Sequence, residues 1–167
     1  MTDSPNIIVD GYNYILRTGR IDMSQEHALW DARERLIRQL IGYRGQRQIA
    51  VTIVFDGLDL KGIAQLPRPK GVSVIFSQKP KNADAKIEEL VRSAKQPRAV
   101  TVVTSDRSLA AKVAGYGADT LTVEAFAQKL MARDAEDEYQ QKYRAQLSRD
   151  ELDEWLKLFD ETKQSPD

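Results

Sequence analysis

Short apolar runs alternate along the chain with longer segments in which apolar residues recur every three or four positions. The apolar runs predict strands at residues 6–10, 49–55, 72–76, 99–103 and 118–123. The helical spacing predicts helices over residues 25–48, 82–95 and 107–114, and a helical end over residues 123–167. Because strands and helices alternate at this spacing, we expect parallel βαβ units whose sheet is covered by helices on both faces.

The helical end contains an apolar stripe behind a helix-start signal. Ser148 and Glu151 have the spacing of a capping box, which predicts that a new helix begins there. The stripe recurs at helical spacing: Leu152, Trp155, Leu156 and Phe159. We interpret it as a face that packs on the preceding domain, with a docking face for a partner as the alternative. We therefore divide the chain into a domain at 1–145 and an acidic amphipathic helix with a frayed tail at 146–167.

Composition narrows the chemistry that the chain can perform. It has 167 residues, of which 41% are hydrophobic, enough for the core of one domain. No apolar run approaches the ~18 residues that span a bilayer, and the start lacks the pattern of a secretory signal, so we expect a cytoplasmic protein. The absence of cysteine and the single histidine exclude thiolate nucleophiles, cysteine-based metal centres and two-histidine metal sites. The groups that could still carry out catalysis are carboxylates, hydroxyls, lysines and a metal ion held by oxygen ligands.

The charge is unevenly distributed along the chain. Residues 1–122 carry 18 Lys/Arg and 13 Asp/Glu, whereas residues 123–167 carry 7 and 12. A basic body followed by an acidic end is a pattern found in proteins that contact nucleic acid. The distribution therefore favours a polyanionic partner without identifying one.

Acidic residues stand where the predicted strands end. Asp10, Asp56 and Asp106 each follow a strand, and Asp84 lies in the first turn of the helix after the third strand. Since the carboxyl ends of parallel strands meet at one edge of a sheet, we expect these four side chains to converge there. Clustered carboxylates repel one another unless a cation offsets the charge, and Mg²⁺ or Mn²⁺ suits an all-oxygen site. Each acid taken alone is equally well explained as a turn former or helix cap.

The segments around these acids resemble a known family. They read IVDGYN at 8–13, VFDG at 54–57, NADAKI at 82–87 and VTSD at 103–106. In this order and spacing they resemble the NYN domain family of PIN-like nucleases, in particular its YacP-like branch, which includes a bacterial ribosome-associated endoribonuclease. The similarity extends over about residues 6–145.

The resemblance implies an α/β, PIN-like three-layer fold, with a central, mostly parallel sheet of about five strands flanked by helices and followed by C-terminal helices. It also implies a metal site holding Mg²⁺ or Mn²⁺ and endonucleolytic cleavage of RNA. By motif matching, Asp10, Asp84 and Asp106 are the metal-binding catalytic acids, and Asp56 is a fourth acid placed further out. Asn13 and Ser105 are polar neighbours that orient the substrate phosphate, a water or a ligand.

Three further residues are candidate substrate contacts. Lys79 and Lys81 come just before Asp84 and are placed to contact the phosphate backbone. Tyr12 is placed either to stack on an unpaired base or to pack under the sheet edge. One turn beyond Asp84, Glu88 is favoured to form an ion pair with its i+4 neighbour Arg92, with a water-mediated metal contact as the alternative.

The sequence therefore predicts a metal-dependent endoribonuclease that acts on single-stranded mRNA, with the ribosome as a further candidate partner. The alternative is a non-catalytic RNA- or ribosome-binding module that keeps the fold. A phosphatase that forms an aspartyl-phosphate is disfavoured, because Tyr12 stands where that chemistry needs a second acid after Asp10.

Overall fold

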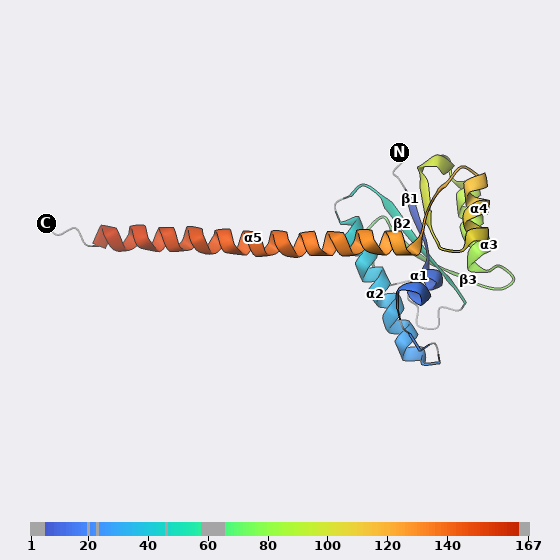
Figure 1. The fold of residues 1–167 in the computed structure, drawn as a ribbon, viewed down its shortest axis with the longest axis horizontal. Helices are drawn as coiled ribbons and strands as arrows, with labels where there is room; N and C mark the ends of the chain where they lie inside the picture. The colour runs from blue at the N-terminus through green and yellow to red at the C-terminus, as the bar shows by residue number, and fades with distance from the viewer. Residues whose placement is uncertain (1–5, 20, 23, 46, 58–65, 164–167) are drawn as a thin grey trace. The chain divides into compact units, whose positions relative to one another are not determined.

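Five parallel strands form one sheet in the computed structural model, which describes residues 6–19, 21–22, 24–45, 47–57 and 66–163 (Figure 1). The strands are β1 (Asn6–Asp10), β2 (Ala50–Asp56), β3 (Val72–Ser77), β4 (Val100–Val103) and β5 (Asp119–Leu121). Their order in the sheet is β3-β2-β1-β4-β5. The predicted α/β fold with a five-stranded parallel sheet is confirmed.

The order of the strands creates a switch in winding direction at β1. Strand β1 pairs with β2 on one side and with β4 on the other, so that Val9 lies opposite Ile53 and Val103. The chain first winds from β1 outward through β2 and β3 and then returns to continue through β4 and β5. In open α/β sheets ligands bind at such a switch point, outside the carboxyl ends of the strands. The carboxyl ends of β1 and β4 therefore mark the expected site.

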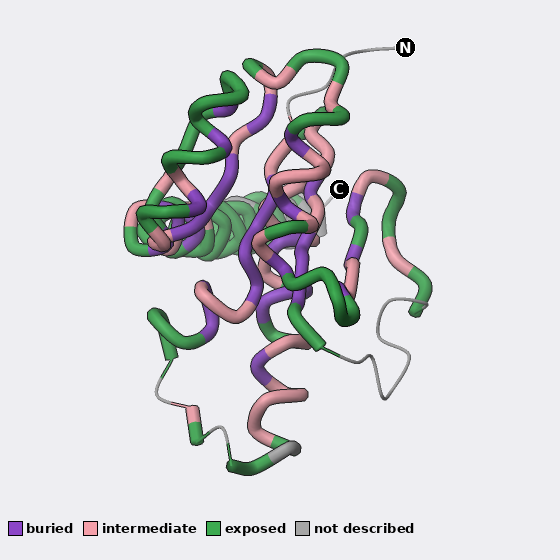
Figure 2. Tube along the Cα trace, turned by 90° about the vertical axis from the view of Figure 1, so that its right-hand side faces the viewer, coloured by how far each residue is buried: buried purple, intermediate pink, exposed green. Residues whose placement is uncertain are grey.

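Helices cover both faces of the sheet and bury two hydrophobic clusters (Figures 1 and 2). The helices are α1 (Gly11–Thr18), α2 (Glu26–Arg44), α3 (Ala83–Ser93), α4 (Arg107–Gly115) and α5 (Val123–Lys163), with a short 3₁₀ turn at Pro97–Ala99. Ile8 and Val9 alternate in β1 and point to opposite faces. Ile8 joins the cluster with α3 and α4, and Val9 joins the cluster with α1, α2 and the start of α5. Burial on both faces explains why the strands read as unbroken apolar runs.

The end of the chain differs from the expectation at one point. The predicted capping box is wrong, because Ser148 lies inside α5 and the side-chain cap of that helix is instead the Thr122 hydroxyl, which accepts from the Ala125 N–H at 3.2 Å. Residues 131–147 contain neither glycine nor proline, so nothing in them ends the helix. The helix therefore continues through Ser148 in spite of the capping signal there.

The chain divides into a compact unit at Met1–Leu130 and a second unit at Met131–Asp167. The domain boundary expected at residue 145 falls inside α5 and stays a prediction. The same holds for the packing or docking role of the apolar stripe, since the side chains of Trp155 and Phe159 lie outside the described residues. None of the helices in the described ranges is both long and apolar enough to cross a membrane.

The glycine after Asp10 is required by a close approach. Gly11 begins α1 with no loop residue between it and β1, directly against β2. A Cβ atom there would lie 2.4 Å from the Phe55 ring and 3.0 Å from the Val54 carbonyl oxygen. Phe55 is fully buried and held by the rings of Tyr12 and Phe76, so it has little room to move. Only glycine fits at this position without displacing the core.

Replacement of Gly11 by alanine should therefore destabilise the fold. We expect Gly11→Ala to lower the free energy of unfolding by about 1–3 kcal/mol, as for other overpacked core positions. Urea denaturation followed by circular dichroism measures this change. Gly115→Ala is the matched control, because a Cβ atom at the end of α4 meets nothing within 4 Å. Equal stability of the two variants would contradict the close approach at Gly11.

Candidate active site at the carboxyl edge of the sheet

Asp10 is a buried carboxylate at the end of the central strand. It has an exposed fraction of only 6% and makes no side-chain cap to α1, although that helix begins at the next residue. Its Oδ2 atom accepts a hydrogen bond from the Thr104 hydroxyl at 3.1 Å. Thr104 follows β4 directly, so this bond joins the carboxyl ends of β1 and β4 at the switch point.

The acids predicted from the strand ends act on one another electrostatically. Burial, together with the negative charges of Asp84 and Asp106, raises the pKa of Asp10 to about 6 against the opposing hydrogen bond from Thr104. The pKa of Asp84 is also raised, first by burial and then by Asp106 and Asp56, while Lys112 opposes the shift. Such repulsion weakens with distance, so these mutual effects on pKa mean that the four carboxylates, which come from separate segments, lie close to one another.

Two of these acids also make local contacts. The Asp106 side chain caps α4, since its Oδ1 accepts from the Leu109 N–H at 3.1 Å, while its own backbone N–H donates to the Thr104 hydroxyl. Asp56 is exposed and accepts a long bond of 3.4 Å from the Ser77 hydroxyl. The helix-cap interpretation of Asp106 therefore holds for one carboxylate oxygen and leaves the other for a second role.

The metal-binding potential of the edge depends on how these oxygens are placed. No group of three Asp, Glu, His or Cys side chains among the described residues is arranged to hold one metal ion. Asp10, Asp84 and Asp106 thus do not form the preassembled ligand set that the sequence analysis expects, and the metal assignment stays a prediction. The donor chemistry fits Mg²⁺ or Mn²⁺, which accept one or two carboxylates together with waters and phosphate oxygens.

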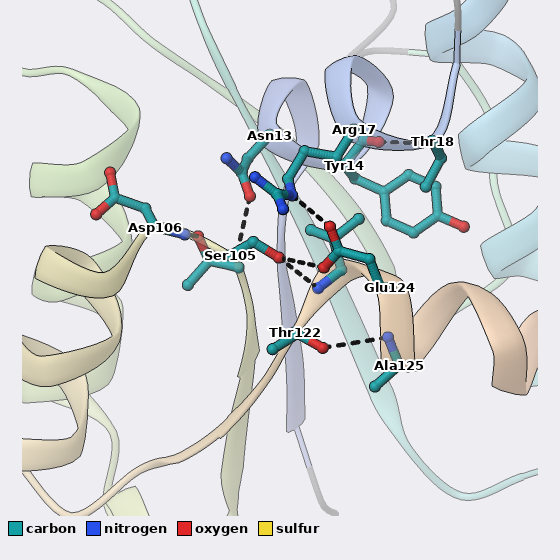
Figure 3. Close-up of polar contacts among 11 residues, drawn as sticks. Asn13, Tyr14, Arg17, Thr18, Ser105, Asp106, Thr122, Glu124 and Ala125 are labelled. Carbon is teal, nitrogen blue, oxygen red and sulfur yellow. Dashed lines mark hydrogen bonds and ion pairs between the residues drawn. The ribbon is translucent and has the colours of Figure 1, made fainter.

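A hydrogen-bonded network lies beside the acids and includes both predicted polar neighbours (Figure 3). The Ser105 N–H donates to Asn13 Oδ1 at 2.8 Å, and the Ser105 hydroxyl donates to Glu124 Oε2 at 2.7 Å. Glu124 Oε1 accepts from Arg17 Nε at 2.5 Å. The hydrogen bond from Ser105, together with the Glu124 backbone N–H and Arg17, holds the pKa of Glu124 at about 2, so its carboxylate is ionised.

Sequence reasoning missed Thr104 and Glu124. Thr104 stands inside the motif that contains Asp106, but nothing in the sequence shows that its hydroxyl reaches Asp10, which lies 94 residues away. Glu124 lies in the first turn of the helix that follows β5, the same placement that singled out Asp84 after β3. The rule that found Asp84 therefore also finds Glu124 when it is applied to the short fifth strand.

Tyr12 is occupied by packing contacts. Its ring lies 5.2 Å from the Phe55 ring, and the Arg33 guanidinium lies over it at 5.2 Å and donates to its hydroxyl. The packing interpretation of Tyr12 is therefore the one that these contacts favour, and stacking on a base stays a prediction.

The charged side chains around α3 differ partly from expectation. Lys79 is exposed, whereas Lys81 Nζ pairs with Glu89 at 2.7 Å. Glu88 accepts from the Tyr116 hydroxyl at 2.9 Å, and its expected ion pair with Arg92 is not found among the ion pairs of the described residues. Contact of either lysine with RNA stays a prediction.

Comparisons with known proteins connect this geometry to a family. Residues 7–164 match the YacP-like NYN domain. The chain is 29% identical over 113 residues to YacP, an uncharacterized protein of Bacillus subtilis, and the alignment covers 67% of this chain and 66% of that protein. Two crystal structures of Rae1 (YacP) from Bacillus subtilis, one of a mutant, are similar at 25% identity. The mutant structure has a TM-score of 0.64, and the match covers 80% of this chain and 79% of that chain. The other structure has a TM-score of 0.61, and the match covers 98% of this chain and 96% of that chain.

The buried charge at Asp10 should be visible in the stability of the protein. Because the pKa of Asp10 rises from its usual 3.8 to about 6, the ionised side chain destabilises the folded state above that pH. The rise corresponds to on the order of 3 kcal/mol, and the neutral amide in Asp10→Asn removes most of it while still accepting from Thr104. We expect Asp10→Asn to melt at a higher temperature than the wild type at pH 7.5 in EDTA.

The stability that Asp10→Asn gains over the wild type should fall as the pH is lowered. It is complete above pH 6, shrinks as the pH falls toward 4, and disappears where Asp10 is protonated in both the folded and the unfolded state. Asp119→Asn, an exposed acid at the start of β5, is the control and should show no such gain. A loss of stability in Asp10→Asn at pH 7.5 would contradict a buried ionised carboxylate.

Proposed function

The chain belongs to the YacP-like NYN domain family, and from this membership together with the coupled carboxylates we propose that it is a metal-dependent endoribonuclease. The observation that carries the proposal is Asp10, whose pKa is raised by burial and by Asp84 and Asp106. A buried carboxylate surrounded by like charges weakens the fold, and such groups concentrate at functional sites. The proposed substrate is single-stranded RNA, in particular mRNA, and the ribosome is the proposed setting.

The donor set supports an oxygen-held divalent cation. Asp10, Asp84 and Asp106 would hold Mg²⁺ or Mn²⁺, one or two of them directly and the others through water. When bound, the ion supplies charge stabilisation to the phosphodiester and lowers the pKa of water. Asp56, exposed at the end of β2, is the proposed outer acid.

The remaining side chains orient these acids and the RNA. Thr104 holds one carboxylate oxygen of Asp10, and the capping bond fixes the Asp106 carboxylate. The side-chain oxygen of Asn13 accepts a hydrogen bond from the Ser105 N–H. The NH₂ group of Asn13 can therefore donate to a phosphate oxygen. Water would add to phosphorus, the bond from phosphorus to the 3′-oxygen would break, and that oxygen would take up the proton that the water releases, which leaves 5′-phosphate and 3′-hydroxyl ends.

The other proposed substrate contacts lie around this centre. Lys79 and Lys81 would contact the phosphate backbone, Ser105 would orient the substrate phosphate through the Asn13 amide, and Tyr12 would stack on a base. Because Lys81 is paired with Glu89 and Tyr12 is held by Arg33, contact with RNA would have to exchange or extend these interactions. Lys79, which is exposed, is the substrate contact that needs no such exchange.

A second candidate function is a non-catalytic RNA- or ribosome-binding module. The observation that favours it is the lack, among the described residues, of three side chains arranged to hold one metal ion. Such a module would bind RNA equally well with and without a chelator and would leave it intact. The coupled carboxylates argue against it, because a negative site repels RNA unless a cation is bound.

Removal of single charges at the edge should abolish cleavage. We expect Asp84→Asn and Asp106→Asn to lower kcat on a 5′-labelled single-stranded RNA by at least ~100-fold in Mg²⁺ or Mn²⁺. Asparagine is as good a helix cap as aspartate, so Asp106→Asn keeps the cap of α4 and isolates the loss of charge.

The control for this experiment is again Asp119→Asn. Asp119 starts β5 and so lies at the amino ends of the strands, away from the acids, and this variant should cleave at the wild-type rate. Chelation with EDTA should stop the wild-type reaction. Wild-type rates in Asp106→Asn would remove that residue from the site. RNA binding without cleavage under all conditions would establish the non-catalytic module instead.

A further inference from the structure

Glu124 connects the start of α5 to α1 and to the last motif segment. It lies in the first turn of α5, with Arg17 of α1 on one side of its carboxylate and Ser105 on the other (Figure 3). Arg17 follows the first motif by four residues, and Ser105 belongs to the last one. Glu124, which lies outside every motif, thus contacts Arg17, which lies one helical turn after the first motif, and Ser105, which lies within the last one.

The direction of the hydrogen bonds makes Glu124 the residue that orients the Ser105 hydroxyl. The Val123 N–H donates to Ser105 Oγ at 3.0 Å, and an N–H group can only donate. The hydroxyl must therefore accept there and give its single proton elsewhere. The ionised Glu124 carboxylate, which can only accept, takes that proton at 2.7 Å.

The fixed hydroxyl in turn fixes the backbone of residues 104–106. The Ser105 N–H donates to the Asn13 amide oxygen, which turns the Asn13 nitrogen away from Ser105 (Figure 3). The neighbours of Ser105 on either side are Thr104, which holds Asp10, and Asp106, which caps α4. Displacement of Ser105 would therefore move groups that contact Asp10 and Asn13.

Exposure argues against a purely structural role for the pair. The side chains of Arg17 and Glu124 are 49% and 52% exposed, and exposed ion pairs contribute little to stability. A contact on which the fold hardly depends, but which orients groups at the acid cluster, is typical of support for a reactive site.

We propose that Glu124 is a positioning residue for RNA cleavage: anchored by Arg17, it fixes the Ser105 hydroxyl and, through the Ser105 backbone, the Asn13 amide and the Asp106 carboxylate. This inference rests on the proposed function. Glu124 itself contacts neither Asp10 nor Asp106 through any hydrogen bond recorded among the described residues, so its effect on the reaction is indirect.

The test is Glu124→Gln, which keeps the size of the side chain but offers one acceptor oxygen in place of two. One of its two partners, Arg17 or Ser105, then faces an NH₂ group instead of an acceptor. We expect kcat to fall roughly 10- to 100-fold while KM stays within about twofold, because the proposed RNA contacts of Lys79, Lys81 and Tyr12 are untouched and only the groups at the cleaved phosphate are misaligned. The melting temperature should stay at the wild-type value.

Hydrogen exchange gives a measurement that does not depend on activity. The amides of Val123 and Ser105 are protected by the network, so both should exchange on the order of tenfold faster in Glu124→Gln. Exchange in β1 and β2 should not change. This pattern, measured on the full chain, shows whether Glu124 orders the segment even in a sample without RNA.

Arg17→Gln distinguishes an anchor from a direct phosphate contact. If Arg17 acts through Glu124, the double variant should be no slower than Glu124→Gln alone, because both changes interrupt one chain of contacts. A rise in KM that adds to the effect of Glu124→Gln would instead show that Arg17 contacts RNA directly, and would overturn its role as anchor.

Asp137→Asn is the matched control, since Asp137 is also an exposed acid on α5 that pairs with an arginine, Arg133, at 2.6 Å. It should keep wild-type kcat, KM and exchange. Wild-type kcat in Glu124→Gln, or a loss confined to melting temperature, would overturn the positioning role while leaving the nuclease assignment intact. Absence of cleavage by the wild-type protein would overturn the proposed function, and with it the catalytic part of this inference.

Discussion

Parallel pairing of β1 with both β2 and β4 is the constraint from which the candidate site follows. It places the ends of two strands, 94 residues apart in sequence at Asp10 and Thr104, within hydrogen-bond distance. The Thr104 hydroxyl then serves both sides of the switch point, because it donates to Asp10 and accepts from the Asp106 N–H. Without this pairing the acids would be isolated turn residues, and no common electrostatic effect would link them.

The same strand pairing places Asp10 where its ionised carboxylate lowers the stability of the fold. Asp10 is placed among buried apolar side chains and near other carboxylates, where an ionised group is unfavourable. Outside the cluster that Asp10 forms with Asp84 and Asp106, the described acids are exposed or paired, as Glu89 is with Lys81 and Asp137 is with Arg133. The exception stands where the fold predicts a ligand, which is the pattern expected when a protein accepts a cost in folding for a chemical task.

Much of the fold and the position of the acids could be predicted from the sequence, because apolar runs and strand ends are local signals. The sheet, its parallel direction and the region shared by Asp10, Asp84 and Asp106 follow from them. The partner of a side chain was not predictable, since it depends on segments brought together only by folding. Arg33 holds Tyr12 across 21 residues, and Arg17 holds Glu124 across 107. The course of α5 was misjudged for a related reason: a capping signal at Ser148 is local, whereas helix continuity depends on the many residues before it.

The direct passage from β1 into α1 limits how this segment can change in evolution. Asp10 ends the strand and Gly11 begins the helix, so no connecting residue absorbs an insertion or a deletion. One added residue would rotate α1 by roughly 100° and carry Asn13 and Arg17 away from Ser105 and Glu124. Length variation among related chains should therefore accumulate in other connections, while the spacing between Asp10, Asn13 and Arg17 stays constant.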